Sequence, residues 1–94
     1  MIDFLKKCNF SDIEIKQIEE VNSSANLYNL NCNEFDVVKI IEYLHQIGFN
    51  DVLHVLMYNI DIFFTSFDEF KSNFENKDKR IIDIINYEYN ETNL

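Results

Sequence analysis

Residues 41–70 read "IEYLHQIGFNDVLHVLMYNIDIFFTSFDEF", and the spacing of their apolar side chains indicates the architecture of the chain. The stretch contains the chain's single glycine, Gly48, and neither lysine nor arginine. On both sides of the glycine, apolar residues recur three and four positions apart, which is the spacing of one face of an α-helix. Glycine often ends a helix, because it adopts a left-handed backbone conformation without strain. The stretch therefore predicts a helix, a tight turn at Gly48 and Phe49, and a second helix.

The same periodicity along the rest of the chain predicts an all-α fold of about six helices, either a compact bundle or a short α-solenoid. The chain has no proline, so asparagine has to supply most of the breaks. We expect left-handed helix ends at Asn9, Asn22, Asn59 and Asn76. The expected helices cover residues 2–8, 11–21, 33–47, 51–58, 66–74 and 78–89. Residues 23–32 are expected to form an irregular connector, either a loop throughout or a loop with one helical turn at Leu27–Leu30, and residues 90–94 a frayed tail.

Several helix starts carry capping residues. Ser11 with Glu14, and Ser66 with Glu69, have the spacing of a capping box, in which each residue bonds the backbone N–H of the other. Asn33 and Asn50 are expected to cap the helices that follow them. The spacing also predicts which side chains point inward: Ile2, Leu5, Cys8, Ile15, Ile18, Val21, Val37, Ile40, Ile41, Leu44, Ile47, Val52, Val55, Leu56, Phe67, Phe70, Phe74, Ile81, Ile84 and Ile85.

Part of the chain repeats itself. Residues 2–13, "IDFLKKCNFSDI", align with residues 41–52, "IEYLHQIGFNDV", so that Asn9 falls on Gly48 and Phe10 falls on Phe49. Residues 80–90 echo residues 51–61. These matches predict a single domain, 1–94, with repeat-like units at about 2–22, 41–75 and 78–90. A helix pair of this kind cannot bury its own apolar face, so we expect the units to stack on one another.

Residues 41–70 resemble one repeat of the mitochondrial transcription termination factor family. Repeats of that family run as a helix ending in Leu-Gly-Phe, a capped second helix and a connector to the next repeat. The likeness covers about residues 2–22 and 41–75. It implies an α-solenoid, which in that family binds nucleic acid along a basic concave face. The connector proline of the family is missing at Ile60–Asp61, and the best-matching stretch carries only acidic charge.

Charge and composition indicate the kind of partner. The 94 residues are 47% hydrophobic, with nine Phe and five Tyr, and the formal net charge is −9. Such a surface repels phosphate backbones and anionic lipids and attracts basic proteins. The chain contains no apolar run near the ~20 residues that span a bilayer, and its start does not resemble a signal peptide. We expect a soluble cytoplasmic protein that binds neither membrane nor nucleic acid directly.

No motif in the sequence predicts catalysis. Asp51, His54 and Tyr58 share a helix face, but a zinc site needs three or four ligands at recognisable spacing. Cys8 or Cys32 could pair with a histidine as a nucleophile, yet both are better explained as small buried hydrophobic residues. We therefore expect a non-enzymatic protein without cofactor or metal.

The absence of cations between Lys39 and Lys71 is the strongest indication of a functional surface. Three phenylalanines fall within residues 63–67, too many for all of the rings to reach the core. We expect some of them to lie at the surface inside a rim of carboxylates. The predicted partner-binding residues are Glu42, Asp51, Asp61, Phe63, Phe64, Phe67, Asp68 and Glu69. The alternative is an ordinary solvated surface with acids at helix N-termini.

These observations predict a small acidic module that docks on a basic surface of a partner protein, including a surface that normally holds nucleic acid. The size, charge and composition fit an inhibitor or regulator from a phage or other mobile element, such as an anti-CRISPR-like nucleic-acid mimic, an immunity protein or an antitoxin. The alternative, which follows the family resemblance, is a helical-repeat protein that binds nucleic acid.

Overall fold

A computed structural model describes residues 1–92, with side-chain environments for residues 1–85. This part of the chain is helical and contains no strand, so the predicted all-α class is confirmed. In chain order the elements are η1 (Asp3–Cys8), α1 (Asp12–Val21), α2 (Ser24–Cys32), α3 (Glu34–Gln46), α4 (Val52–Tyr58), η2 (Ile60–Phe63), α5 (Phe67–Glu75) and α6 (Lys79–Thr92), where η denotes a 3-10 helix.

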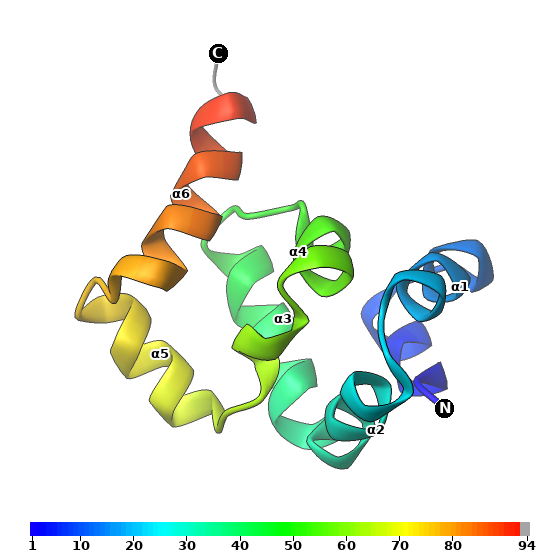
Figure 1. The fold of residues 1–94 in the computed structure, drawn as a ribbon. Helices are drawn as coiled ribbons and strands as arrows, with labels where there is room; N and C mark the ends of the chain where they lie inside the picture. The colour runs from blue at the N-terminus through cyan, green and yellow to red at the C-terminus, as the bar shows by residue number, and fades with distance from the viewer. Residues whose placement is uncertain (93–94) are drawn as a thin grey trace.

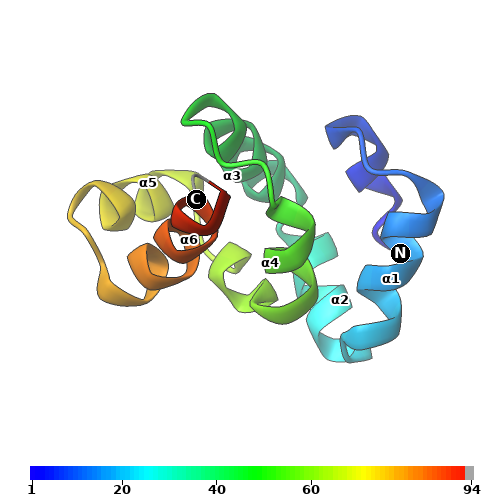
Figure 2. The same ribbon diagram turned by 90° about the horizontal axis from the view of Figure 1, so that it is seen from above.

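The helices form three groups side by side (Figures 1 and 2). One group contains η1, α1 and α2, the middle group contains α3, α4 and η2, and the third contains α5 and α6. Helix α1 packs on α4 and α2 packs on η2, while α3 contacts η1 on one side and α5 on the other. The middle group is thus covered on two sides, which explains why α3 and α4 carry apolar residues around much of their circumference.

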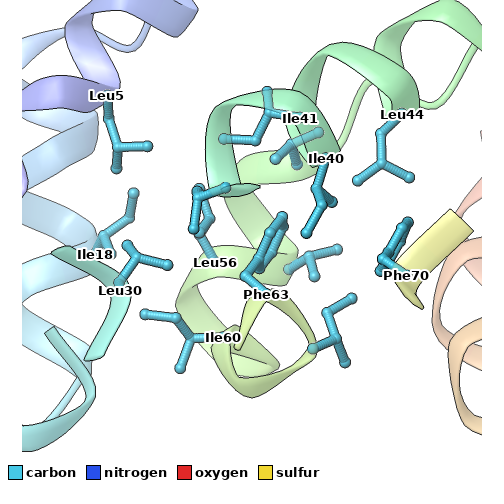
Figure 3. Packing of buried hydrophobic residues seen from close by; sticks show 14 of the residues in the cluster. Leu5, Ile18, Leu30, Ile40, Ile41, Leu44, Leu56, Ile60, Phe63 and Phe70 are labelled. Carbon is cyan, nitrogen blue, oxygen red and sulfur yellow. The ribbon is translucent and has the colours of Figure 1, made fainter. Parts of the chain in front are cut away.

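The core runs through all three groups (Figure 3). Phe63 lies near its centre, with Leu30 on one side and Phe70 on the other, and all three side chains have an exposed fraction of 0%. Among the described side chains, none of the buried ones is polar or charged. Each fully buried large apolar side chain stabilises the fold by roughly 1.5–3 kcal/mol. In a chain this short, the few largest residues therefore carry much of the stability.

Two helix ends have the same backbone turn. Asn9 (φ 69°) and Gly48 (φ 92°) both adopt the left-handed conformation that the sequence predicts. The N–H of Phe10 donates to the carbonyl of Leu5 at 3.3 Å, and the N–H of Phe49 donates to that of Leu44 at 2.9 Å. Each bond reaches back five residues and is the longer of the two hydrogen bonds that define a Schellman motif. The aligned segments of the internal repeat thus fold into the same turn.

A third copy of this turn joins α5 to α6, one residue later than predicted. Lys77, with φ 58°, takes the left-handed position, and the N–H of Asp78 donates to the carbonyl of Asn73 at 2.8 Å. The prediction for Asn76 is wrong, because its φ is −84°. Asn22 and Asn59 also have negative φ, at −116° and −139°. Asn22 ends its helix in another way, since its side-chain amide donates to the carbonyls of Ile18 and Leu56 at 2.9 and 3.0 Å.

The connector predicted at residues 23–32 is instead the helix α2. Ser23 begins it, because its hydroxyl accepts the backbone N–H of Asn26 at 3.1 Å. Leu30 is buried against the middle group, while Leu27 is partly buried. Two inward leucines give too short an apolar pattern to identify a helix from the sequence. The predicted tail is also shorter, because α6 continues to Thr92; residues 93–94 lie outside the described part.

Some side chains expected in the core are exposed. Val21 is the last residue of α1 and Ile47 follows the end of α3; their exposed fractions are 47% and 39%. Both lie where the chain turns away from its neighbours, so helical periodicity no longer determines their environment. Cys32, the last residue of α2, is exposed as well, while Cys8 is partly buried against the core.

Three of the predicted caps need correction. Asn33 precedes α3, but its side chain makes no capping bond to that helix. The Ser11–Glu14 capping box is complete, with both reciprocal bonds present. At α5, Ser66 accepts the N–H of Glu69 at 3.1 Å, but the Glu69 carboxylate accepts the hydroxyl of Thr65 instead of the Ser66 N–H. Asp51, one residue after the predicted Asn50, is the residue that precedes α4.

Candidate interaction surface

The predicted partner-binding residues do not form one surface. Glu42 lies on the side of α3 that faces η1, where its charge is one cause, after burial, of a raised pKa at the Cys8 thiol. Asp51 lies in the loop between α3 and α4. Figure 1 shows this loop at the opposite end of the molecule from the connection between η2 and α5, where the other predicted residues lie. Glu42 and Asp51 therefore do not join the other residues.

Phe63 belongs to the core, so its predicted place in a surface patch is wrong. Residues 60–63 form a 3-10 helix, in which side chains three positions apart point the same way. Ile60 and Phe63 are consequently both turned inward, as Figure 3 shows. The carbonyl of Phe63 is held by the side-chain amide of Asn33 at 2.8 Å, which fixes this part of the backbone against the start of α3.

Phe67 is only partly exposed, because its ring packs in an aromatic cluster around Tyr43. The ring of Tyr43 meets those of Phe67, Phe70 and Phe74 edge to face, with centroids 5.8, 6.5 and 5.9 Å apart. The same burial raises the pKa of the Tyr43 hydroxyl, with a further contribution from Glu75. The cluster joins α3 to α5, so Phe67 stabilises the fold and offers little of its ring to a partner.

Phe64 differs from its neighbours, because it separates two open hollows. The first, the α6 hollow, has a volume of about 410 Å³ and is lined by Ile62, Phe64, Thr65, Glu69, Asn73, Asp78, Arg80 and Ile81. The second, the α2 hollow, has a volume of about 390 Å³ and is lined by Asn29, Cys32, Asn33, Asp36, Phe64, Thr65 and Ser66. The two hollows share Phe64 and Thr65, so they are neighbours at the η2–α5 connection.

The α6 hollow combines apolar and acidic side chains. Ile62, Phe64 and Ile81 supply the apolar part, and the exposed carboxylates of Glu69 and Asp78 supply negative charge. The Glu69 carboxylate accepts the hydroxyl of Thr65 at 3.0 Å. These residues come from η2, from α5 and from the start of α6.

Arg80 is the single cation among the described residues that line either hollow. Its guanidinium donates two hydrogen bonds of 2.7 Å to the carboxylate of Asp61. These hydrogen bonds hold the pKa of Asp61 below its usual range, and burial opposes the shift. Asp61 pairs with Arg80, and the Asp78 carboxylate accepts backbone N–H groups at the positive end of α6. The exposed carboxylate of Glu69 is therefore the acid of this hollow that is least offset by the protein itself.

The polar groups of the α2 hollow are mostly engaged within the protein. A carboxylate oxygen of Asp36 accepts the backbone N–H of Phe67 at 2.8 Å, at the start of α5. The positive end of that helix offsets the Asp36 charge. The amide of Asn33 donates to the carbonyls of Phe63 and Thr65, both at 2.8 Å. The single charge among the residues that line this hollow, that of Asp36, is therefore partly offset by α5.

Sequence reasoning identified Asp61, Phe64 and Glu69 at this surface and missed Asp36, Asp78 and Arg80. Asp68 is exposed in the first turn of α5 and lines neither of the two hollows. Asp78 fits the alternative explanation of acids at helix N-termini, because its carboxylate accepts the N–H groups of Arg80 and Ile81 at the start of α6. Asp36 bonds the N–H of Phe67, 31 positions away, and Arg80 bonds Asp61, 19 positions away. Local sequence patterns do not predict contacts over such separations.

A third hollow, of about 180 Å³, brings Cys8 and His45 to one site. Burial and the charge of Glu42 raise the pKa of the Cys8 thiol, which disfavours the nucleophilic thiolate. Near α4, the rings of His54 and Tyr58 lie 5.0 Å apart, so these two residues do share a face. Within the described residues, no group of three or more His, Cys, Asp or Glu side chains could hold a metal ion.

None of the helices that the structure describes has both the length and the apolarity to cross a bilayer. No protein-family model matches the chain, and no curated protein or solved structure matches it significantly. The resemblance of residues 41–70 to a transcription termination factor repeat thus stays a prediction. The properties of the two hollows are the main guide to function.

Proposed function

We propose that this protein is a small acidic binding module that holds a basic side chain of a partner protein in the α6 hollow. The observation that carries this proposal is the pairing of Arg80 with Asp61, which leaves the exposed carboxylate of Glu69, together with that of Asp78 at the start of α6, beside an apolar wall. A lysine or arginine side chain has a matching structure, with an apolar stem and a cationic head. Its stem would lie on Phe64 and Ile81, and its head would meet the carboxylates.

The charge of the whole chain supports the same partner. A net charge of −9 accelerates encounter with a basic surface and slows encounter with nucleic acid. A protein of this size and charge fits an inhibitor that occupies a basic, nucleic-acid-binding surface of its target. Such inhibitors are useful to a phage or other mobile element, so we propose that setting as well.

The test is a pair of variants with the same change in charge. The hollow variant carries Glu69→Gln and Asp78→Asn, substitutions that keep an oxygen to accept the bonds from Thr65 and from the α6 backbone. The control variant carries Glu20→Gln and Asp51→Asn, which change an exposed helical glutamate and the aspartate that precedes α4. Both variants lose two negative charges, so they differ only in where the charge is lost.

Binding of a fluorescent lysine- and arginine-rich peptide, followed by anisotropy at several salt concentrations, gives the readout. We expect the hollow variant to bind roughly tenfold more weakly than the control variant, equal to about 1.4 kcal/mol. Equal loss in the two variants would mean that the peptide responds only to net charge, and the proposal would fail. Tight, steeply salt-dependent binding of duplex DNA or RNA in place of the peptide would favour a nucleic-acid-binding helical repeat.

A further inference from the structure

Helix α2 differs from most of the surface, because it is exposed but carries no charge. Residues 21–33 are the longest stretch of the chain without an acidic or basic side chain, in a protein whose net charge is −9. Helix α4 also lacks a charged side chain, but it packs between α1 and η2 and buries Val52, Val55 and Leu56. Helix α2 instead lies at the edge of the molecule, as Figures 1 and 2 show.

The exposed side of α2 leads directly to an exposed aromatic ring at the start of α3. Ala25, Tyr28, Asn29 and Cys32 are all exposed and recur three and four positions apart, so they share one side of α2. Phe35 follows in the first turn of α3. Together these five residues form the neutral face. The exposed fractions of Tyr28 and Phe35 are 60% and 86%, and Phe35 is the most exposed large apolar side chain that the structure describes.

The two acidic residues beside Phe35 are partnered within the chain. The carboxylate of Glu34 lies 3.5 Å from the Nζ atom of Lys7, and that of Asp36 accepts the backbone N–H of Phe67 at 2.8 Å. Depletion of charge together with exposed aromatic rings is typical of the central part of a protein–protein interface. The neutral face therefore has the composition of an interface that a single chain leaves uncovered.

We infer that the neutral face binds the neutral face of a second copy of this chain, in a twofold dimer. The charge of the chain favours this occupant. Two copies of net charge −9 repel each other, and the repulsion is weakest where both surfaces lack charge. A basic partner gains no electrostatic attraction at an uncharged face and is drawn to the acidic surfaces instead.

A twofold dimer brings the same residues of both copies together, so Tyr28 and Phe35 of each copy are covered at once. No residue of the neutral face lines the α6 hollow. The inference thus goes beyond the proposed function and does not depend on it.

Sedimentation equilibrium of the full chain, over a range of protein concentrations, tests for the dimer. The average mass should rise with concentration from 11.3 kDa towards twice that value. Raising the salt concentration from about 0.01 M to about 0.1 M shortens the Debye length from about 30 Å to about 10 Å. Because salt screens the repulsion between the two acidic copies, the dissociation constant of the dimer should fall, by roughly threefold or more.

Two matched variants locate the interface. Phe35 and Ile13 are each the second residue of a helix, each lies between two acidic residues, and their exposed fractions are 86% and 73%. Phe35→Glu and Ile13→Glu therefore add the same charge in the same local setting. Phe35→Glu should raise the dissociation constant of the dimer by about tenfold or more, whereas Ile13→Glu should change it by less than about threefold. If circular dichroism shows that Phe35→Glu unfolds, Tyr28→Ala tests the same face.

Three results would overturn the inference. One is a mass of 11.3 kDa at every protein and salt concentration, which would leave the neutral face to another occupant or to solvent. Another is a dimer that weakens as salt rises, because opposite charges would then hold it together. The third is an equal loss of dimer in Phe35→Glu and Ile13→Glu, which would place the interface elsewhere. None of these results affects binding of a basic peptide to the α6 hollow, so the proposed function is tested separately.

Discussion

Arg80 and Asp61 are joined by two hydrogen bonds of 2.7 Å, one from each terminal nitrogen of the guanidinium. The pair connects α6 to η2 and gives the C-terminal helix a fixed polar contact with the middle group. It also places a neutralised cation beside the α6 hollow. The same contact thus affects the stability of the fold and the charge of the candidate site, and the two effects can be separated by mutation.

The first prediction concerns stability and pH. About half of each side chain is exposed, 52% for Asp61 and 55% for Arg80, so solvent screens the pair. Asp61→Asn should lower the free energy of unfolding by only about 0.5–1 kcal/mol at neutral pH. The pKa of Asp61 is lower in the folded state than its usual value of 3.8, so the contribution is present above pH 3.8 and is lost as the pH falls below it.

Urea unfolding of both proteins across this pH range checks the prediction. The difference between wild type and Asp61→Asn should shrink steadily below pH 3.8. Asp83→Asn, at an exposed position on α6, is the matched control and should show little difference at any pH. A difference for Asp61→Asn that stays constant down to about pH 2 would mean that the ion pair does not cause it.

The second prediction uses the same pair to test function. Asp61→Asn frees the Arg80 charge beside the α6 hollow, whereas Arg80→Gln frees the Asp61 charge. We expect the first variant to bind a basic peptide more weakly than wild type and the second to bind it more tightly, since only the sign of the released charge differs. The two variants lose the same ion pair, so a purely structural role would shift both affinities in one direction. Anisotropy titrations at low salt provide the measurement.

The third prediction concerns the turn at Gly48. A Cβ atom added there would meet no atom within 4 Å, so the main cost of substitution comes from the backbone φ of 92°. Gly48→Val should lower the free energy of unfolding by more than ~1 kcal/mol, because a β-branched residue is strained at positive φ. Gly48→Asn should cost less, since Asn9 occupies the corresponding position with φ 69°. Thermal unfolding of the two variants should separate them clearly; equal melting temperatures would argue against the shared turn.

The difference between local and long-range contacts explains what the sequence could reveal. The Ser11–Glu14 box and the left-handed turns at Asn9 and Gly48 depend on residues a few positions apart, and all were predictable. The same local reasoning missed α2, whose inward face has only two leucines.

The candidate surface depends mainly on distant residues. Asp36 bonds the backbone at Phe67, and Arg80 bonds Asp61. The sequence indicated an excess of acidic residues and exposed aromatic rings, but it could not show that Glu42 and Asp51 lie elsewhere. It also could not show that Phe63 points inward, because the 3-10 geometry of η2 is set by packing against its neighbours.

The fourth prediction concerns Asn33, which connects the start of α3 to the η2–α5 connection. Its amide makes two hydrogen bonds of 2.8 Å, to the carbonyls of Phe63 and Thr65. Asn33→Ala leaves both carbonyls without this donor and should lower the free energy of unfolding by about 2 kcal/mol. Asn31→Ala, two residues earlier and exposed, is the control and should stay within about 0.5 kcal/mol of wild type. If the two variants melt together, solvent replaces the lost bonds at no cost.

The last prediction separates Phe64 from Phe67, two rings that have the same chemistry but different surroundings. Phe67 packs edge to face on Tyr43, so Phe67→Ala should lower the free energy of unfolding by about 2 kcal/mol or more and affect peptide binding less. Phe64 lines both hollows and is partly exposed, so Phe64→Ala should cost less stability. It should reduce peptide affinity roughly tenfold, because it removes the apolar wall on which the stem of the basic side chain rests. Measured together, unfolding and anisotropy should rank the two variants in opposite order. The same order in both measurements would mean that Phe64 acts through the fold alone.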